Sequence, residues 1–150
     1  MDIHHLGKLL ALAVIILVQV GCEVDMSIAI NGSNPPSFSL SGTGNLLFFN
    51  VMEVPPESQE QSIQRSSDAN KLLWKIRPLS GAANKIRALP VITYGVIPDG
   101  FEQIFPADGS PPLRLTDGKI YEAVGTAYNS NGGLVWFRVD DRRAWPVPTP

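Results

Sequence analysis

The sequence predicts an all-β protein, an antiparallel two-sheet sandwich of about seven strands, preceded by a signal-peptide helix. Three observations carry this prediction. The 150 residues include 13 Gly and 13 Pro, which indicates many turns and argues against a helical bundle. Several apolar runs alternate with a period of two, which is the pattern of half-buried strands. A chain of this length suits one folded domain.

The N-terminal segment is predicted to be an export signal. Leu9–Val18 is an uncharged apolar run of ten residues, shorter than the roughly 20 that span a membrane. The run is followed closely by Gly21-Cys22. This order resembles that of bacterial lipoprotein precursors. The resemblance implies that residues 1–21 are a signal peptide and that Cys22 is acylated, so that the membrane is a partner of the chain.

Two neighbours of the cysteine refine this expectation. Gln19 departs from the family pattern, which has Leu or a similar aliphatic residue at that place. Glu23 stands where Asp often retains such proteins at the inner membrane, so the outer membrane of a bacterial cell envelope is favoured. Two alternatives stay open: Leu9–Val18 as an uncleaved anchor, or as a core helix with Cys22 as an ordinary buried thiol.

Removal of the signal peptide would remove every histidine. His4 and His5 are the two histidines of the chain, and both precede Cys22. A Ser-His-Asp triad and a Cys-His pair both require an imidazole. Zinc and copper sites usually use imidazole or thiolate ligands. This argues against zinc and copper sites and leaves carboxylate chemistry and oxygen sites for hard metals open. The carboxylates carry no motif for such a site, so we expect no metal site and no cofactor.

The remaining chain divides into three parts. Residues 22–36 are polar and are expected to be a flexible tether. Residues 37–143 form the predicted β-sandwich domain, and residues 144–150, with three prolines in AWPVPTP, an extended Pro-rich tail. Proline pairs, which remove backbone donors and so discourage edge-to-edge pairing, stand at Pro35-Pro36, Pro55-Pro56 and Pro111-Pro112.

The predicted strands follow from alternating faces. One face of each strand should enter the core. These faces are Leu47, Phe49 and Val51; then Leu72, Trp74 and Ile76; then Ile92, Tyr94 and Val96; then Val135, Phe137 and Val139.

Turn signals separate these runs. Asn131-Gly132-Gly133 predicts a hairpin turn. Asp99-Gly100, Asp108-Gly109 and Asp117-Gly118 recur every nine residues. A calcium-binding nonapeptide repeat would need further glycines and a fixed acidic pattern. Ordinary tight turns explain the three pairs better.

A stretch near the C-terminus resembles the last third of a fibronectin type III domain. It reads LTDGKIYEAVGTAYNSNG, and the matching positions are Leu115, Gly118, Tyr121, Ala127, Asn129 and Gly132. The resemblance implies a fibronectin-like or immunoglobulin-like sandwich with a tyrosine corner, in which buried Tyr121 bonds backbone a few residues upstream. It also suggests Trp74 as the large aromatic residue between the sheets. Ala123 and Gly125 depart from the aliphatic residues usual in that strand.

A candidate binding face lies on the last predicted hairpin. If Val135, Phe137 and Val139 enter the core, Trp136 and Arg138 face outward. A regular hairpin would place Tyr128 or Thr126 beside them. Exposed Tyr128, Trp136 and Arg138 would form a recognition surface for a protein or a glycan. The alternative is that the tail or the loop of residues 53–70 covers Trp136.

The expected function is that of a non-enzymatic, lipid-anchored envelope protein whose β-sandwich acts as a binding or scaffold module. Another envelope protein or a glycan is the expected partner. A formal net charge of -2 argues against nucleic acid. The alternative is a small carboxylate-dependent carbohydrate-active or hydrolytic domain. Glycoside hydrolysis needs two carboxylates that face each other, but Asp140 and Asp141 point to opposite faces of a strand. The other carboxylates considered, Glu53, Glu102 and Glu122, carry no motif.

Overall fold

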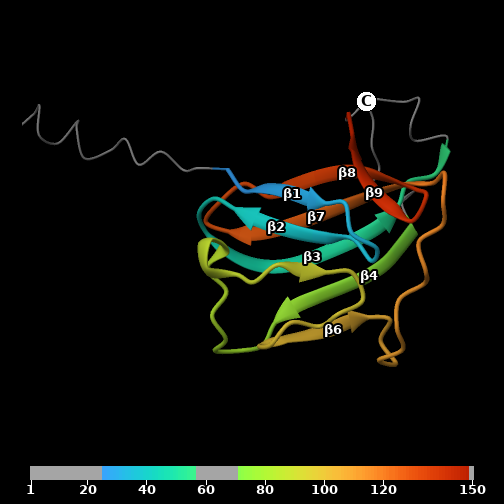
Figure 1. Cartoon of the computed structure of the whole chain (residues 1–150). Coiled ribbons are helices and arrows are strands. Elements are labelled where there is room, and N and C mark those ends of the chain that lie inside the picture. Colours follow the sequence, from blue (N-terminus) through green and yellow to red (C-terminus); the bar gives the residue numbers. More distant parts are fainter. Residues whose placement is uncertain (1–24, 57–70, 149–150) are drawn as a thin grey trace, which may run out of the picture.

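The protein is an all-β structure of two antiparallel sheets, described by a computed structural model for residues 25–56 and 71–148 (Figure 1). One sheet has three strands and the other has six. The strands are β1 (Ser27–Asn31), β2 (Ser37–Ser41), β3 (Asn45–Glu53), β4 (Lys71–Pro78), β5 (Ile92–Thr93), β6 (Phe101–Phe105), β7 (Ile120–Tyr128), β8 (Gly133–Asp140) and β9 (Arg143–Val147). A short 3₁₀ helix, η2 (Ile86–Ala88), connects β4 to β5.

The sheets form two layers, as the alternating sequence predicted. The small sheet has the order β1-β2-β5, and the large sheet has the order β6-β4-β3-β7-β8-β9. Strand β1 packs on β7, β8 and β9 of the large sheet (Figure 1). The apolar faces of the two layers therefore meet in one core.

The core is aromatic. Phe38 of β2 meets Phe49 of β3 and Phe137 of β8, with ring centroids 5.2 Å and 5.5 Å apart. Trp74 of β4, which is fully buried, continues this cluster to Tyr94 at 5.6 Å, edge to face. These tilted and edge-on arrangements are the favoured ones for aromatic pairs. The prediction that Trp74 lies between the sheets is confirmed.

The predicted alternation fails at one place in β3. Phe49 and Val51 are fully buried, but Leu47 is 39% exposed and its neighbour Leu46 is buried. The pairing of β3 with β7 shifts register between Leu46 and Phe48. This bulge inserts one residue and moves the preceding side chains to the other face, so Leu46 replaces Leu47 in the core.

Both ends of the described chain are strands where a tether and a tail were expected. Ser27–Asn31, inside the expected tether of residues 22–36, forms β1 and pairs with β2. Its position is fixed by Ile28, which is 9% exposed. Residues 143–147, at the start of the expected tail, form β9 on the edge of the large sheet. The tail is extended there as predicted, but it is paired and buries Ala144.

Met26, which comes just before β1, packs very closely against the β7–β8 hairpin. A Cβ at Gly133 would lie 2.6 Å from the carbonyl oxygen of Met26, and one at Gly125 would lie 2.7 Å from the end of the Met26 side chain. Only glycine permits so close an approach. The absence of the usual aliphatic residue at Gly125 therefore has a packing reason: the Met26 side chain takes its place.

The segment expected to be a signal helix, residues 1–21, lies outside the described residues, as does Cys22. Within residues 25–56 and 71–148, none of the helices has the length and apolar character that crossing a membrane requires.

Candidate functional site

A groove of about 660 Å³ lies at the end of the two-sheet structure where β1 turns into β2 and β8 turns into β9. This volume is within the range of small-ligand sites. Four connections that are distant in sequence form its walls. The lining residues are Asn34, Pro35, Pro36, Tyr94, Gly95, Pro111, Pro112, Arg114, Leu115, Asp117, Val139 and Arg142.

Backbone hydrogen bonds join these connections to one another. The Tyr94 amide donates to the carbonyl of Pro36 at 2.9 Å, which ties the segment after β5 to the β1–β2 connection. The Gly118 amide donates to the carbonyl of Val139 at 2.8 Å, which ties the segment before β7 to β8. The groove is therefore formed by fixed backbone.

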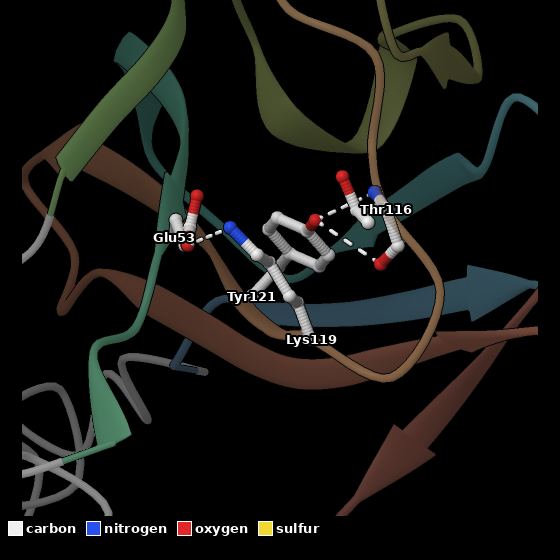
Figure 2. A network of polar contacts seen from close by, with 4 residues as sticks. All are labelled: Glu53, Thr116, Lys119 and Tyr121. Atoms are coloured by element: carbon white, nitrogen blue, oxygen red, sulfur yellow. Dashed lines mark hydrogen bonds and ion pairs between the residues drawn. The ribbon is translucent and has the colours of Figure 1, made fainter.

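Two buried tyrosines hold the segment that carries Arg114. The Tyr94 hydroxyl donates to the carbonyl of Leu113 at 2.8 Å. On the other side of Arg114, the Tyr121 hydroxyl accepts from the amide of Thr116 at 2.8 Å and lies 3.3 Å from its carbonyl oxygen (Figure 2). Residues 113–116 are thus fixed at both ends by side chains that belong to the core.

Tyr121 also confirms the predicted tyrosine corner. It is 1% exposed, and its hydroxyl bonds backbone five residues upstream. Beside it, Lys119 donates to the carboxylate of Glu53 at 2.5 Å, which joins the start of β7 to the end of β3 (Figure 2). This hydrogen bond raises the pKa of Lys119. Burial, together with the nearby Tyr121, raises the pKa of Tyr94 and keeps its phenol neutral.

The groove carries two cationic side chains and one anionic side chain. Arg114, Arg142 and Asp117 are all exposed. Neither guanidinium forms an ion pair with a carboxylate of the described residues. The groove therefore has a net charge of one positive, above walls formed largely by proline, leucine and valine.

Arg142 has an unfavourable backbone conformation. Asp140 pairs with Arg143, which leaves Asp141 and Arg142 as a two-residue turn between β8 and β9. Their φ angles are 49° and 60°. A turn with positive φ at both positions favours Asn-Gly or Asp-Gly, because a Cβ at the second position is strained. The turn between β8 and β9 therefore has arginine where glycine would be favoured.

Trp136 does not face solvent, so the exposed binding face is wrong at this residue and the alternative, a covered Trp136, holds. Trp136 is 1% exposed, although it lies on the face opposite Phe137 as predicted. Its partner across β7 is Glu122, itself 6% exposed, and not Tyr128 or Thr126. The pairing of β7 with β8 ends at Gly125 and Gly133, so the register differs from that of a regular hairpin with a turn at Asn131-Gly132-Gly133.

The other two residues of the expected binding face are exposed but far apart. Tyr128 is 60% exposed and pairs with Asn45 at the end of β7. Arg138 is exposed and pairs with Ile120 at the start of β7. Eight residues of strand correspond to about 26 Å. Tyr128, Trp136 and Arg138 therefore do not form one exposed patch, and a recognition role for Tyr128 or Arg138 stays a prediction.

The three Asp-Gly pairs are turns, as the simpler interpretation held. The φ angles of Gly100, Gly109 and Gly118 are 80°, 75° and 79°. Asp108 accepts hydrogen bonds from the amide and the hydroxyl of Ser110 at 3.0 Å and 2.7 Å, and these bonds lower its pKa. Among the residues that the structure describes, no three His, Cys, Asp or Glu side chains gather in a way that could hold a metal ion.

The carboxylates considered for hydrolysis are distributed over the large sheet. Glu53 pairs with Lys119, and Glu102 pairs with Arg77 at 2.6 Å. Glu53 pairs with Tyr121, and Glu122 pairs with Met52. The two glutamates therefore stand at successive positions of the strand pair and point to opposite faces of the sheet. No observation at these residues favours the hydrolytic alternative.

The sequence contained partial signals for the groove. Pro35-Pro36 and Pro111-Pro112 were visible, but they were interpreted only as protection of strand edges. A role for Arg114 could not be predicted, because nothing in the neighbouring sequence shows that Tyr94 and Tyr121 hold Leu113 and Thr116.

Comparison with known proteins identifies no family for this chain: no family model, no curated protein and no solved structure matches it.

Proposed function

We propose that this chain is a lipid-anchored protein of the bacterial cell envelope whose β-sandwich acts as a non-enzymatic binding or scaffold module. The groove at one end of the two sheets carries this proposal. It is a concave surface in which two arginines, neither in an ion pair with a carboxylate of the described residues, lie among prolines, leucine and valine, and a few polar groups among apolar ones are the usual character of a binding site. An envelope protein or a glycan, rather than nucleic acid, is the proposed class of partner.

A fibronectin-like or immunoglobulin-like fold supports the binding role. The order β1-β2-β5, facing β3-β7-β8, is consistent with strands A-B-E and C-F-G of such sandwiches. Tyr121 stands near the start of β7, where a tyrosine corner belongs in strand F. Four features differ from that pattern: β4, β6 and β9 extend the large sheet, and Trp74 lies on β4 and not on the strand that corresponds to C.

The anchor is proposed from the sequence of the export segment. Gly21-Cys22 after Leu9–Val18 supports cleavage before Cys22 and acylation of its thiol. Stable anchoring requires more than one acyl chain, which lipoprotein processing supplies. Glu23 favours the outer membrane.

The test of the anchor compares Cys22→Ala with the unaltered chain and with Gln19→Leu. The unaltered chain should lose residues 1–21, gain acyl mass and sediment with membranes. Cys22→Ala should gain no acyl mass and should leave the membrane fraction after export. Gln19→Leu restores the aliphatic residue of the family pattern and should be processed at least as completely. If the unaltered chain keeps residues 1–21 and gains no acyl mass, the segment is an uncleaved anchor and the lipoprotein proposal fails.

A further inference from the structure

We propose that the end groove binds a monoanionic carboxylate attached to an apolar body, as at the free C-terminus of an apolar peptide. This inference rests on the proposed binding role and specifies its ligand. Arginine guanidinium groups match a carboxylate through paired hydrogen bonds. Arg114 and Arg142 supply two such groups, and Leu115 and Val139 supply apolar wall.

The charge of the groove favours a carboxylate over a phosphate. Two arginines and Asp117 leave one net positive charge, which a single negative charge neutralises. A phosphate dianion would leave one negative charge in excess and would lie near the Asp117 carboxylate, which repels it.

The geometry prepares Arg114 for this task. Its segment is fixed by the Tyr94 and Tyr121 hydroxyls on either side, so little backbone ordering remains for a ligand to impose. Arg142 stands at a turn position where glycine would be less strained. A costly arginine conformation beside a groove is explained if its guanidinium contacts a ligand.

The groove lies at the far end of β1 from Asp25, the described residue nearest in sequence to the proposed anchor. The chain enters β1 next to Asp25, three residues after Cys22, and leaves it at the connection that carries Asn34 and Pro36. The five residues of β1 separate these ends by about 16 Å. A lipid at Cys22 would hold the first end at the membrane, so the groove would open toward solutes and proteins of the surrounding compartment. Lipid headgroups are thereby the less suitable source of the anion.

The experiment uses the full chain in detergent micelles, so that it does not depend on processing at Cys22. The probe is N-acetyl-Pro-Leu-Val with a free carboxylate, compared with the same peptide amidated. The arginine side-chain Nε–Hε resonances are followed by NMR during titration. The free acid should shift the resonances of Arg114 and Arg142 saturably, and the amide should bind roughly tenfold more weakly or worse.

Variants separate the groove from general surface charge. Arg114→Gln with Arg142→Gly should weaken binding of the free acid by roughly tenfold or more. Arg142→Gly relaxes the turn, so loss of folding does not explain that result. Arg143→Gln is the matched control, because Arg143 is exposed in the same hairpin but does not line the groove. It should leave binding within about twofold, since exposed charges contribute little.

Four results would overturn the proposal. They are no saturable shift at either arginine, equal binding of acid and amide, equal weakening by Arg143→Gln, and equal shifts caused by inorganic phosphate at the same concentration. Binding to phosphatidylserine vesicles that is lost with Arg114→Gln would also overturn it, in favour of a lipid site. Failure of the anchor appears only in processing at Cys22, so the two proposals fail by different results.

Discussion

Replacing Tyr121 with Phe removes the hydroxyl that bonds the Thr116 backbone, next to the groove residues Arg114 and Leu115, and leaves the ring in place. The lost contacts are the 2.8 Å bond from the Thr116 amide and the weaker 3.3 Å contact with the Thr116 carbonyl. A bond of the first kind contributes about 0.5–1.5 kcal/mol net, and a donor left without an acceptor raises the loss. Thr116 is exposed, so water can replace part of the bond. We therefore expect the free energy of unfolding to fall by about 1–1.5 kcal/mol.

Equilibrium urea unfolding, followed by the fluorescence of buried Trp74 and Trp136, measures this change. The midpoint should fall without a change in slope, and the melting temperature should fall by about 3–6 °C per kcal/mol. Tyr128→Phe is the matched control, because that side chain is 60% exposed, and it should have almost no effect. A loss for Tyr121→Phe no larger than the control would refute the reasoning. It would show that bonding to the Thr116 backbone stabilises the fold no more than bonding of the same groups to water does.

Three further changes test other parts of the structure. Gly133→Ala should lower the free energy of unfolding by about 1–3 kcal/mol, because the new Cβ meets the Met26 carbonyl oxygen. Gly125→Ala should lower it less, because the new Cβ meets the movable end of the Met26 side chain. Equal losses in urea unfolding would contradict this. Burial raises the pKa of Tyr94, so the folded chain retains a phenol proton that the unfolded chain releases above about pH 10. The stability this provides is complete below that pH and is lost as the pH rises further, so Tyr94→Phe should flatten the alkaline decline of unfolding free energy. Arg142→Gly should raise the unfolding free energy by about 1 kcal/mol, since it removes a Cβ from a position with positive φ; a lower midpoint would count against a strained turn.

Local alternation was sufficient to predict β3, β4 and β8, but it extended the strand at Ile92 too far, because β5 ends at Thr93 and Val96, expected in the core, is 55% exposed. Phe49, Val51 and Phe137 are buried as their spacing indicated. Tyr121 could be placed because a tyrosine corner combines a local motif with a local hydrogen bond. These features depend on neighbours in sequence, so a single sequence contains the information.

The wrong predictions depend on distant parts of the chain. Alternation placed Trp136 on the second face of β8, but it contains no information on whether that face is covered. The sequence SIAIN in β1 is short and lies in a polar stretch, and its pairing with β2 becomes favourable only once Met26 has a seat on β7 and β8. The groove has the same origin, because four separate connections meet to form it.

The seat of Met26 has a consequence for the order in which the protein can assemble. Met26 is among the first described residues, whereas Gly125 and Gly133, which receive it, follow almost the whole length of the domain later. A chain synthesised from its N-terminus therefore contains β1 long before the hairpin that β1 packs against exists. Contacts of such long sequence separation are slow to form, so the partly synthesised chain lacks the packing of Met26 against Gly125 and Gly133. Folding then waits for the final hairpin, and a chain truncated before β8 should not acquire the native core.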